Sequence, residues 1–311
     1  MNPDKSMSCE ALPRPDWRQA IPLPILEAGL LLAWSSGFIG ARFSVDYAPA
    51  LLVVFWRCVL VTLLLFPFAL PALRQAPVAV LLKNAGIGLL AMAGYLAGIT
   101  QGIALGVPAG LAALFADLLP IGLALLSAGV LGRRLAWPIW IGLMVGLAGV
   151  ALVTQSAMTW GDAPAWAYAL PLLGMLSLAI ATLWQKALAP REQLGLLPNL
   201  WLQCAVSGLA FGILEGTQGS LAPIPSVGFA LSVAWTAGLS TIGGYGLYWL
   251  CLRRASATRI TSLLYLSPPI TMLWAWAMFD EPLSWQMAAG LAASGLGIWM
   301  VVRTEAATRT S

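Results

Sequence analysis

The chain has 311 residues, of which 60% are hydrophobic and only 9% are charged, and it contains no histidine. Soluble globular domains carry about 25% charged residues, so this composition predicts a membrane protein. The missing histidine excludes Ser-His and Cys-His nucleophiles, histidine-ligated zinc and a histidine general base. The four cysteines lack the CxxC spacing of metal or redox sites, and there is no P-loop. We therefore expect neither an enzyme nor a bound cofactor or metal.

A polar tail, residues 1–20, precedes ten apolar stretches, each of about the length that crosses a bilayer. The expected fold class is therefore an all-α polytopic membrane protein with ten transmembrane helices. The expected spans cover residues 21–41, 50–71, 84–104, 107–131, 136–154, 165–188, 197–215, 227–251, 257–279 and 284–302. A second polar tail, residues 303–311, follows the last span.

Basic residues sort to alternate ends of these spans, as the preference of lysine and arginine for cytoplasmic loops requires. With the N-terminus inside, all of the 16 lysines and arginines lie at cytoplasmic ends except Arg42, at an outer end, and Arg57, within a span. Both termini are therefore expected in the cytoplasm. The net charge of +4 reflects this sorting rather than nucleic-acid binding, so the expected partners are the lipid bilayer and a small-molecule substrate. The oligomeric state stays open, with a homodimer as one option.

The two halves of the chain resemble each other at an offset of 148 positions, which predicts a repeat over residues 21–155 and 165–302. The shared positions include Pro120 with Pro268, Trp137 with Trp285, and Gly142 with Gly290. Because each repeat has an odd number of spans, five, the second copy must cross the membrane in the inverted sense. Inverted repeats are typical of secondary transporters, whose binding site lies near the midplane between the halves.

Small residues recur at helical spacing in the fifth and tenth spans, at equivalent positions of the two repeats. They are Gly142, Gly146 and Gly149 in the fifth span, and Gly290, Ser294 and Gly297 in the tenth. Such stripes let helix backbones approach closely. We expect them to serve helix packing and not transport.

Several motifs together resemble the EamA-type transporters of the drug/metabolite transporter superfamily. They are WSSGFIGARF (34–43), FWR (55–57), ALGVPAGLAALFADLLPIGLALLS (104–127), GRRL (132–135) and SLLYLSPPITMLWAWAMFDEPL (262–283). The resemblance runs from about residue 21 to 302 and implies two EamA repeats, an inner-membrane carrier, and export of amino acids or other small metabolites and drugs. One departure is Arg133, where many members carry a glutamate after the glycine, so that only Glu281 of the second half keeps the acidic form.

Asp117 lies about ten residues into the fourth span, and an ionisable residue at that depth is by default a hypothesis for a functional site. The repeat aligns Asp117 with Tyr265, and each precedes a proline, Pro120 or Pro268, by three residues. These prolines, with Pro269, remove backbone donors and predict broken helices at corresponding positions, which point to a transporter's binding site or gate. Asp117 is also the candidate for proton coupling. The alternative is a kink that serves packing, with Asp117 bonded to a neighbour.

Arg57 is the second charged candidate, and it either faces a cavity or extends its side chain to the outer interface. Together with Asp117 it would suit a zwitterion, unless the two side chains pair with each other. Its rough counterpart in the second half is Trp201 or Gln203. Further cavity candidates, whose alternative fate is core packing, are Trp34, Tyr95, Trp184, Tyr245 and Tyr248. An aromatic lining favours amphipathic or aromatic substrates.

The sequence thus predicts a secondary carrier that exports a small metabolite, such as an amino acid, by alternating access. Two alternatives remain. One is a facilitator or exporter of drugs or other small solutes, and the other, from a different class, is a membrane scaffold that transports nothing. The substrate, the coupling ion and the direction of net flux are left open.

Overall fold

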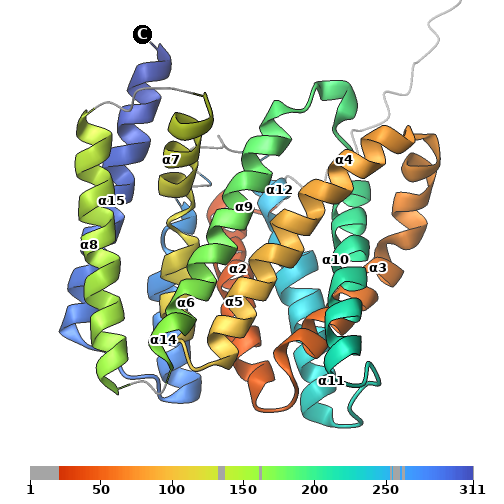
Figure 1. The fold of residues 1–311 in the computed structure, drawn as a ribbon, viewed down its shortest axis with the longest axis horizontal. Helices are drawn as coiled ribbons and strands as arrows, with labels where there is room; N and C mark the ends of the chain where they lie inside the picture. Colours follow the sequence, from red (N-terminus) through yellow and green to blue (C-terminus); the bar gives the residue numbers. More distant parts are fainter. Residues whose placement is uncertain are drawn as a thin grey trace, which may run out of the picture.

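A computed structural model describes residues 21–131, 137–160, 163–252, 254, 260 and 263–310. Every regular element in these ranges is a helix, which agrees with the expected all-α class (Figure 1). The expected N-terminal tail, residues 1–20, lies outside the described ranges, as does the GRRL motif. Nothing further is concluded about either segment.

The first repeat starts with two long helices and continues with spans that are divided into shorter pieces. Its elements are α2 (Leu23–Val45), α3 (Ala50–Gln75), α4 (Val78–Gly88), the π-helical η1 (Leu89–Gly94), α5 (Tyr95–Ala104), α6 (Ala109–Ala116), α7 (Leu119–Leu131) and α8 (Trp137–Trp160). The third span therefore begins at Val78, earlier than expected.

The second repeat follows the same order, with 3-10 turns at two of its connections. Its elements are η2 (Ala165–Tyr168), α9 (Ala169–Ala187), η3 (Pro190–Glu192), α10 (Leu196–Gln218), α11 (Val227–Ala234), the π-helical η4 (Trp235–Gly244), α12 (Tyr245–Leu252), α14 (Ser267–Phe279) and α15 (Trp285–Thr310). The last helix continues through most of the segment that was expected to be a C-terminal tail.

Seven helical stretches of the described residues are long and apolar enough to cross a membrane. Each of the ten expected spans contains at least one described helix. The count of ten membrane crossings and the cytoplasmic position of both termini stay predictions.

The helices break at corresponding places in the two repeats. The turn between α6 and α7 holds Asp117 and Leu118, and the turn before α14 holds Tyr265 and Leu266. In each turn the leucine N–H donates to the carbonyl three residues earlier, at 3.2 Å in the first repeat and 3.0 Å in the second. The proline two residues after each leucine cannot donate the next helical hydrogen bond. The predicted pair of broken helices is therefore present.

Helices α8 and α15 pack along their stripes of small residues, as expected. A Cβ atom on Gly149 would lie 2.5 Å from both the carbonyl oxygen of Gly290 and Oγ of Ser294. A Cβ atom on Gly297 would lie 2.5 Å from the carbonyl oxygen of Gly142. The Ser294 hydroxyl also donates to the Gly146 carbonyl at 3.2 Å. The two backbones are therefore too close for any larger side chain at these positions.

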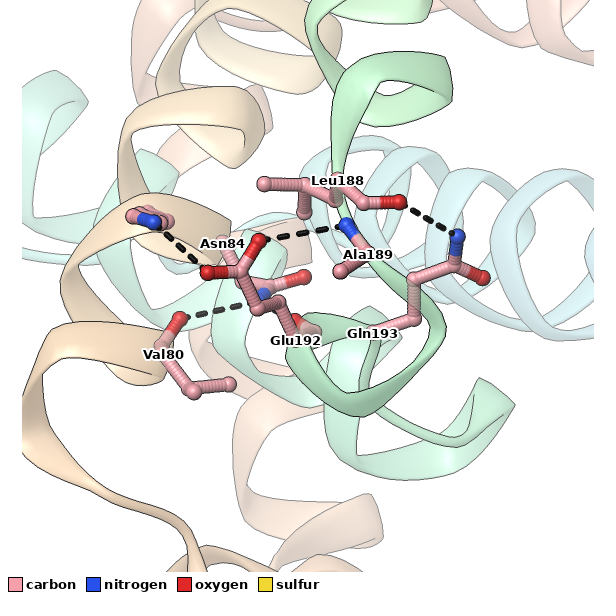
Figure 2. A network of polar contacts seen from close by, with 7 residues as sticks. Val80, Asn84, Leu188, Ala189, Glu192 and Gln193 are labelled. Carbon is pink, nitrogen blue, oxygen red and sulfur yellow. Dashed lines mark hydrogen bonds and ion pairs between the residues drawn. The ribbon is translucent and has the colours of Figure 1, made fainter.

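Polar contacts between the repeats join α4 to the connection between α9 and α10 (Figure 2). Lys83 Nζ donates to Glu192 Oε1 at 2.8 Å, and the other oxygen, Oε2, accepts from the Ala189 N–H at 3.1 Å. Asn84 is 1% exposed, and its Nδ2 donates to the Val80 and Glu192 carbonyls, each at 2.8 Å. The hydrogen bond from Lys83 holds the pKa of the Glu192 carboxyl below its usual range. We name this group the α4–η3 contact.

A second set of polar contacts between the repeats lies at the opposite end of the helices. Arg42, near the end of α2, pairs with Asp46 at 3.1 Å and, more distantly, with Glu281 at 3.9 Å. Glu281 lies between α14 and α15 and also accepts a hydrogen bond from the Ala109 N–H at 3.3 Å. Burial raises the pKa of Glu281 above its usual range. The Arg42 guanidinium also lies 4.8 Å from the centre of the Phe279 ring. We name this group the Arg42–Glu281 contact.

The close helix crossing predicts a large difference between two neighbouring glycines of α15. Gly297→Leu should destabilise the protein by about 1–3 kcal/mol, because the new side chain has to displace the backbone of α8. Gly295→Leu is the matched control, since a Cβ atom there meets nothing within 4 Å. The measurement is thermal unfolding of both purified variants in detergent. Equal unfolding temperatures for the two variants would contradict the described crossing.

The α4–η3 contact predicts a pH-dependent stability. The Glu192 carboxyl has a lower pKa in the folded protein than in the unfolded chain, where its pKa is near 4.5. Its carboxylate therefore stabilises the protein at a pH above the unfolded-state pKa. This stabilisation is lost as the pH falls through the folded-state pKa. The wild-type protein should therefore unfold at a higher temperature than Glu192→Gln at neutral pH, and the difference should shrink below about pH 5. A difference that grows on acidification would show that the carboxylate does not act in this way.

Candidate functional site

An internal cavity lies where α2, α3, η1 and α5 of the first repeat meet η4 and α12 of the second. Its lining consists of Trp34, Gly37, Phe38, Arg57, Ala91, Met92, Tyr95, Leu96, Ile99, Thr100, Ser240 and Tyr245. The cavity volume is about 60 Å³, which is room for a few water molecules. In this form of the protein the cavity is therefore contracted, and a larger occupant requires it to widen.

The two π-helical segments meet at this cavity, and they occupy the third span of each repeat. Segment η1 is followed at once by Tyr95 and η4 by Tyr245, so both tyrosines lie in a Gly-Tyr pair, 150 positions apart. Both tyrosines line the cavity. π-helical turns are rare and frequently mark functional sites. The equivalent halves of the repeat thus each contribute one tyrosine to the same space.

Side-chain hydroxyls donate further hydrogen bonds to backbone carbonyls of the π-helical segments. In η4 the Thr241 hydroxyl donates to the Thr236 carbonyl, five residues earlier, at 2.8 Å. In η1 the Leu90 carbonyl accepts from the Ser177 hydroxyl of α9 at 2.8 Å. A Cβ atom on Gly37 would lie 2.7 Å from Ser240 Oγ, so α2 and η4 also approach each other closely.

Arg57 is among the residues that line this cavity. The residue is 6% exposed, and its Nε donates to the Thr241 hydroxyl oxygen at 2.7 Å. No carboxylate of the described residues lies within ion-pair distance of the guanidinium, Asp117 included. The cavity wall therefore contains a buried positive charge whose counter-charge is missing from the described chain.

Aromatic rings form another part of the lining. The ring of Trp34 lies 5.8 Å from that of Tyr245 and 6.0 Å from that of Tyr248, centre to centre. Tyr248 contacts Trp34 but is not among the residues that line the cavity. Of the candidates predicted from sequence, Trp34, Arg57, Tyr95 and Tyr245 come together at the cavity.

Asp117 lies near this cavity but not in its lining. The residue ends α6, and its Oδ2 is buried with no hydrogen-bond partner among the described residues. Its neighbour Ala116 packs in the same buried cluster as Tyr95 and Trp34 of the lining. An unsatisfied buried carboxylate oxygen destabilises the folded protein. Asp117 is therefore a second ionisable residue beside the cavity.

The remaining candidates lie elsewhere. Tyr265 is half-buried against the large hydrophobic core of the α6–α9 region. Trp184 is 40% exposed, and its ring lies over Gly86 at the contact between α4 and α9. Gln203 is buried in α10, where it packs against Gly88. The alignment of the repeats could not place these side chains, because it gives the position along a helix but not the face.

Three hydroxyl groups at the cavity were not predicted: Thr100 and Ser240 of the lining, and Thr241, which bonds to Arg57. A weak sequence signal existed in the shared Gly-Tyr pair, since a glycine that precedes an aromatic at equivalent points of two repeats suggests a common local geometry. No sequence rule distinguishes a π-helical turn from the α-helix around it. The hydroxyl that orients Arg57 could therefore be found only in the structure.

Comparison with known proteins identifies the family. The EamA-like transporter family matches this chain twice, over residues 25–155 and 165–303. The Escherichia coli K12 protein named "Uncharacterized inner membrane transporter YedA" is 26% identical over 86% of this chain and 86% of its own length. The Salmonella typhimurium protein named "Probable amino-acid metabolite efflux pump" is 24% identical over 88% of this chain and 92% of its own length.

A solved crystal structure has the same fold. It superimposes with a TM-score of 0.59 at 19% sequence identity, over 91% of this chain and 96% of that chain. At this identity the likeness concerns the fold alone. The two family matches coincide with the two repeats seen in the sequence and in the broken helices. The chain therefore belongs to the EamA-like transporter family.

Proposed function

We propose that the protein is a secondary carrier of the inner membrane that exports a small amphipathic metabolite, with an amino acid as the first candidate. In this proposal the protein works by alternating access, both termini lie in the cytoplasm, and the cavity at Arg57 holds the substrate. Membership of a transporter family supports transport rather than catalysis or a scaffold role. The printed names of two relatives, an inner membrane transporter and an amino-acid metabolite efflux pump, support the membrane and the substrate class.

The observation that carries the proposal is the meeting of equivalent π-helical spans at one buried cavity. Transporters built from inverted repeats bind their substrates between the repeats, where helices are interrupted. Here Tyr95 and Tyr245 supply equivalent walls, and Arg57 and Trp34 complete the lining. The mixture of one charge and several aromatic rings suits a small molecule with a charged end and an apolar body.

The broken helices and the polar contacts at the two ends support a rocking movement. The turns at Asp117–Leu118 and Tyr265–Leu266 interrupt the regular helical hydrogen bonding at corresponding positions, so each half has a point at which it can bend. The α4–η3 contact and the Arg42–Glu281 contact join the repeats at opposite ends. In the proposed cycle one contact opens while the other stays closed, with Pro120, Pro268 and Pro269 at the bending points.

Asp117 is proposed to carry the proton that couples transport to the proton gradient. Its buried Oδ2 has no partner in the described structure, and its neighbour Ala116 packs in the same cluster as Tyr95 of the cavity wall. A carboxyl group in this position can take up a proton when the cavity is accessible from one side and release it when the cavity is accessible from the other. The proton then changes the charge next to the substrate in step with the movement.

Counterflow tests the transport proposal directly. Purified protein in proteoliposomes should exchange one class of labelled amino acid, among aromatic, aliphatic and cationic ones assayed separately, in a saturable manner. Unlabelled substrate on the opposite side should accelerate the exchange. If folded protein exchanged none of the three classes, the proposal of an amino-acid carrier would be wrong, and drugs or other small solutes would take first place.

Asp117→Asn tests the coupling. The variant keeps the shape of the side chain but cannot release a proton, so flux driven by a pH gradient should fall about ten-fold or more while counterflow at equal pH persists. Asp280→Asn is a suitable control, because Asp280 is an exposed carboxylate between α14 and α15, and asparagine tolerates its positive φ of 54°. Unchanged pH-driven flux in Asp117→Asn would remove Asp117 from the coupling mechanism.

A further inference from the structure

We propose that the cavity recognises its substrate through a carboxylate held by Arg57, and that an ammonium group on the substrate is dispensable. The substrate class would then be small organic acids with an aromatic or other apolar body, of which amino acids are one subset. This inference rests on the proposed function and narrows it. It concerns the cavity lining alone and is independent of the coupling role given to Asp117.

The first argument is the incomplete bonding of Arg57. Its Nε is taken by the Thr241 hydroxyl, which is itself held by the Thr236 carbonyl, so the guanidinium is fixed in orientation. Its two terminal nitrogens donate to no described residue. A guanidinium presents parallel N–H groups that match the two oxygens of a carboxylate. A ligand carboxylate supplies both the missing acceptors and the missing negative charge.

The second argument is the absence of an acidic residue from the described cavity lining. A zwitterion needs a negative partner for its ammonium, and Asp117 was the sequence-based candidate. In the structure Asp117 lies outside the lining, at the end of α6. The fixed positive charge of Arg57 repels an ammonium in so small a space. The described wall therefore discriminates in favour of the carboxylate and gives the ammonium no matching site.

The third argument concerns the rest of the ligand. Four of the twelve lining residues are aromatic, Phe38, Trp34, Tyr95 and Tyr245, and Met92, Leu96 and Ile99 add apolar surface. Such a wall favours an apolar body by burial and by ring stacking. Because the contracted cavity holds only a few water molecules, the body has to enter as the cavity widens. The carboxylate at Arg57 would then be the fixed point of the bound ligand.

Three ligands with the same aromatic body separate the contributions of the two charged groups. The probes are 3-phenylpropanoate, which has only the carboxylate, L-phenylalanine, which has both groups, and phenethylamine, which has only the ammonium. The measurement is the unfolding temperature of the purified protein in detergent, which a ligand raises when it binds the folded state. Both acids should raise it at millimolar concentration, and the amine should not. Sodium chloride at equal ionic strength tests whether any small anion suffices.

Arg57→Gln should weaken binding of both acids about 30-fold or more, because the bidentate charged partner is lost. The same variant should unfold at the wild-type temperature or above it, since it removes a buried charge without a counter-charge. A purely structural arginine would behave in the opposite way and lower the unfolding temperature. Arg74→Gln, an exposed position at the end of the same helix, is the matched control and should keep both binding and stability.

Each of several outcomes would overturn the inference. The first is that phenethylamine or chloride raises the unfolding temperature as much as the acids do. The second is that Arg57→Gln binds the acids as well as the wild-type protein does. The third is that neither acid raises the unfolding temperature. None of these outcomes would exclude carriage of another solute. If the protein exchanged a labelled solute that has no carboxylate, the proposed transport would stand and only this inference would be refuted. If it bound the acids but showed no counterflow of any solute, only the proposed transport would be refuted.

Discussion

Backbone N–H and C=O groups inside a bilayer have no water with which to form hydrogen bonds, so the chain itself has to satisfy them. This constraint explains why the described ranges contain helices and no strand, and it makes each interruption of a helix informative. The interruptions here are not scattered. The turns at Asp117–Leu118 and Tyr265–Leu266 and the π-helical segments η1 and η4 all occur at paired positions of the two repeats. Hydroxyl groups add further hydrogen bonds at these segments, as Ser177 does at the Leu90 carbonyl, which also accepts the Tyr95 N–H.

The two repeats have similar backbone arrangements, but they differ in the side chains that can carry charge. Tyr95 and Tyr245 are equivalent and line one cavity from two sides. Asp117 and Tyr265 are also equivalent by position, but only one of them carries a charge. Arg57 has no basic counterpart in the second half, where Gln203 packs against Gly88 instead. A symmetric frame thus surrounds an asymmetric distribution of charged side chains.

Much of the fold could be predicted from the sequence, because hydrophobic length and proline position act locally. The helical class, the paired breaks and the use of the small-residue stripes for helix packing follow from spacing alone, and the structure shows all three. That α8 and α15 pack against each other was not predicted. The site was harder to predict. Arg57 at its depth could point to the interface or inward, and only the packing of α3 against η4 decides between them. Predicting where Trp184 and Gln203 point requires the rotation of α9 and α10 about their own axes, and the alignment of the repeats does not give this rotation. The π-helical turns leave no recognisable pattern in the sequence.

The polar contacts that join the repeats at the two ends differ in strength, and this difference has a kinetic consequence. The α4–η3 contact combines a 2.8 Å ion pair with a nearly inaccessible asparagine whose amide bond to the Glu192 carbonyl would be lost on separation. The Arg42–Glu281 contact spans 3.9 Å, and Arg42 keeps Asp46 as a closer partner when Glu281 moves away. Opening at the Arg42 end therefore breaks fewer short bonds and leaves fewer groups unsatisfied. The two half-reactions of a transport cycle should accordingly have unequal barriers, with separation at the α4 end as the slower step.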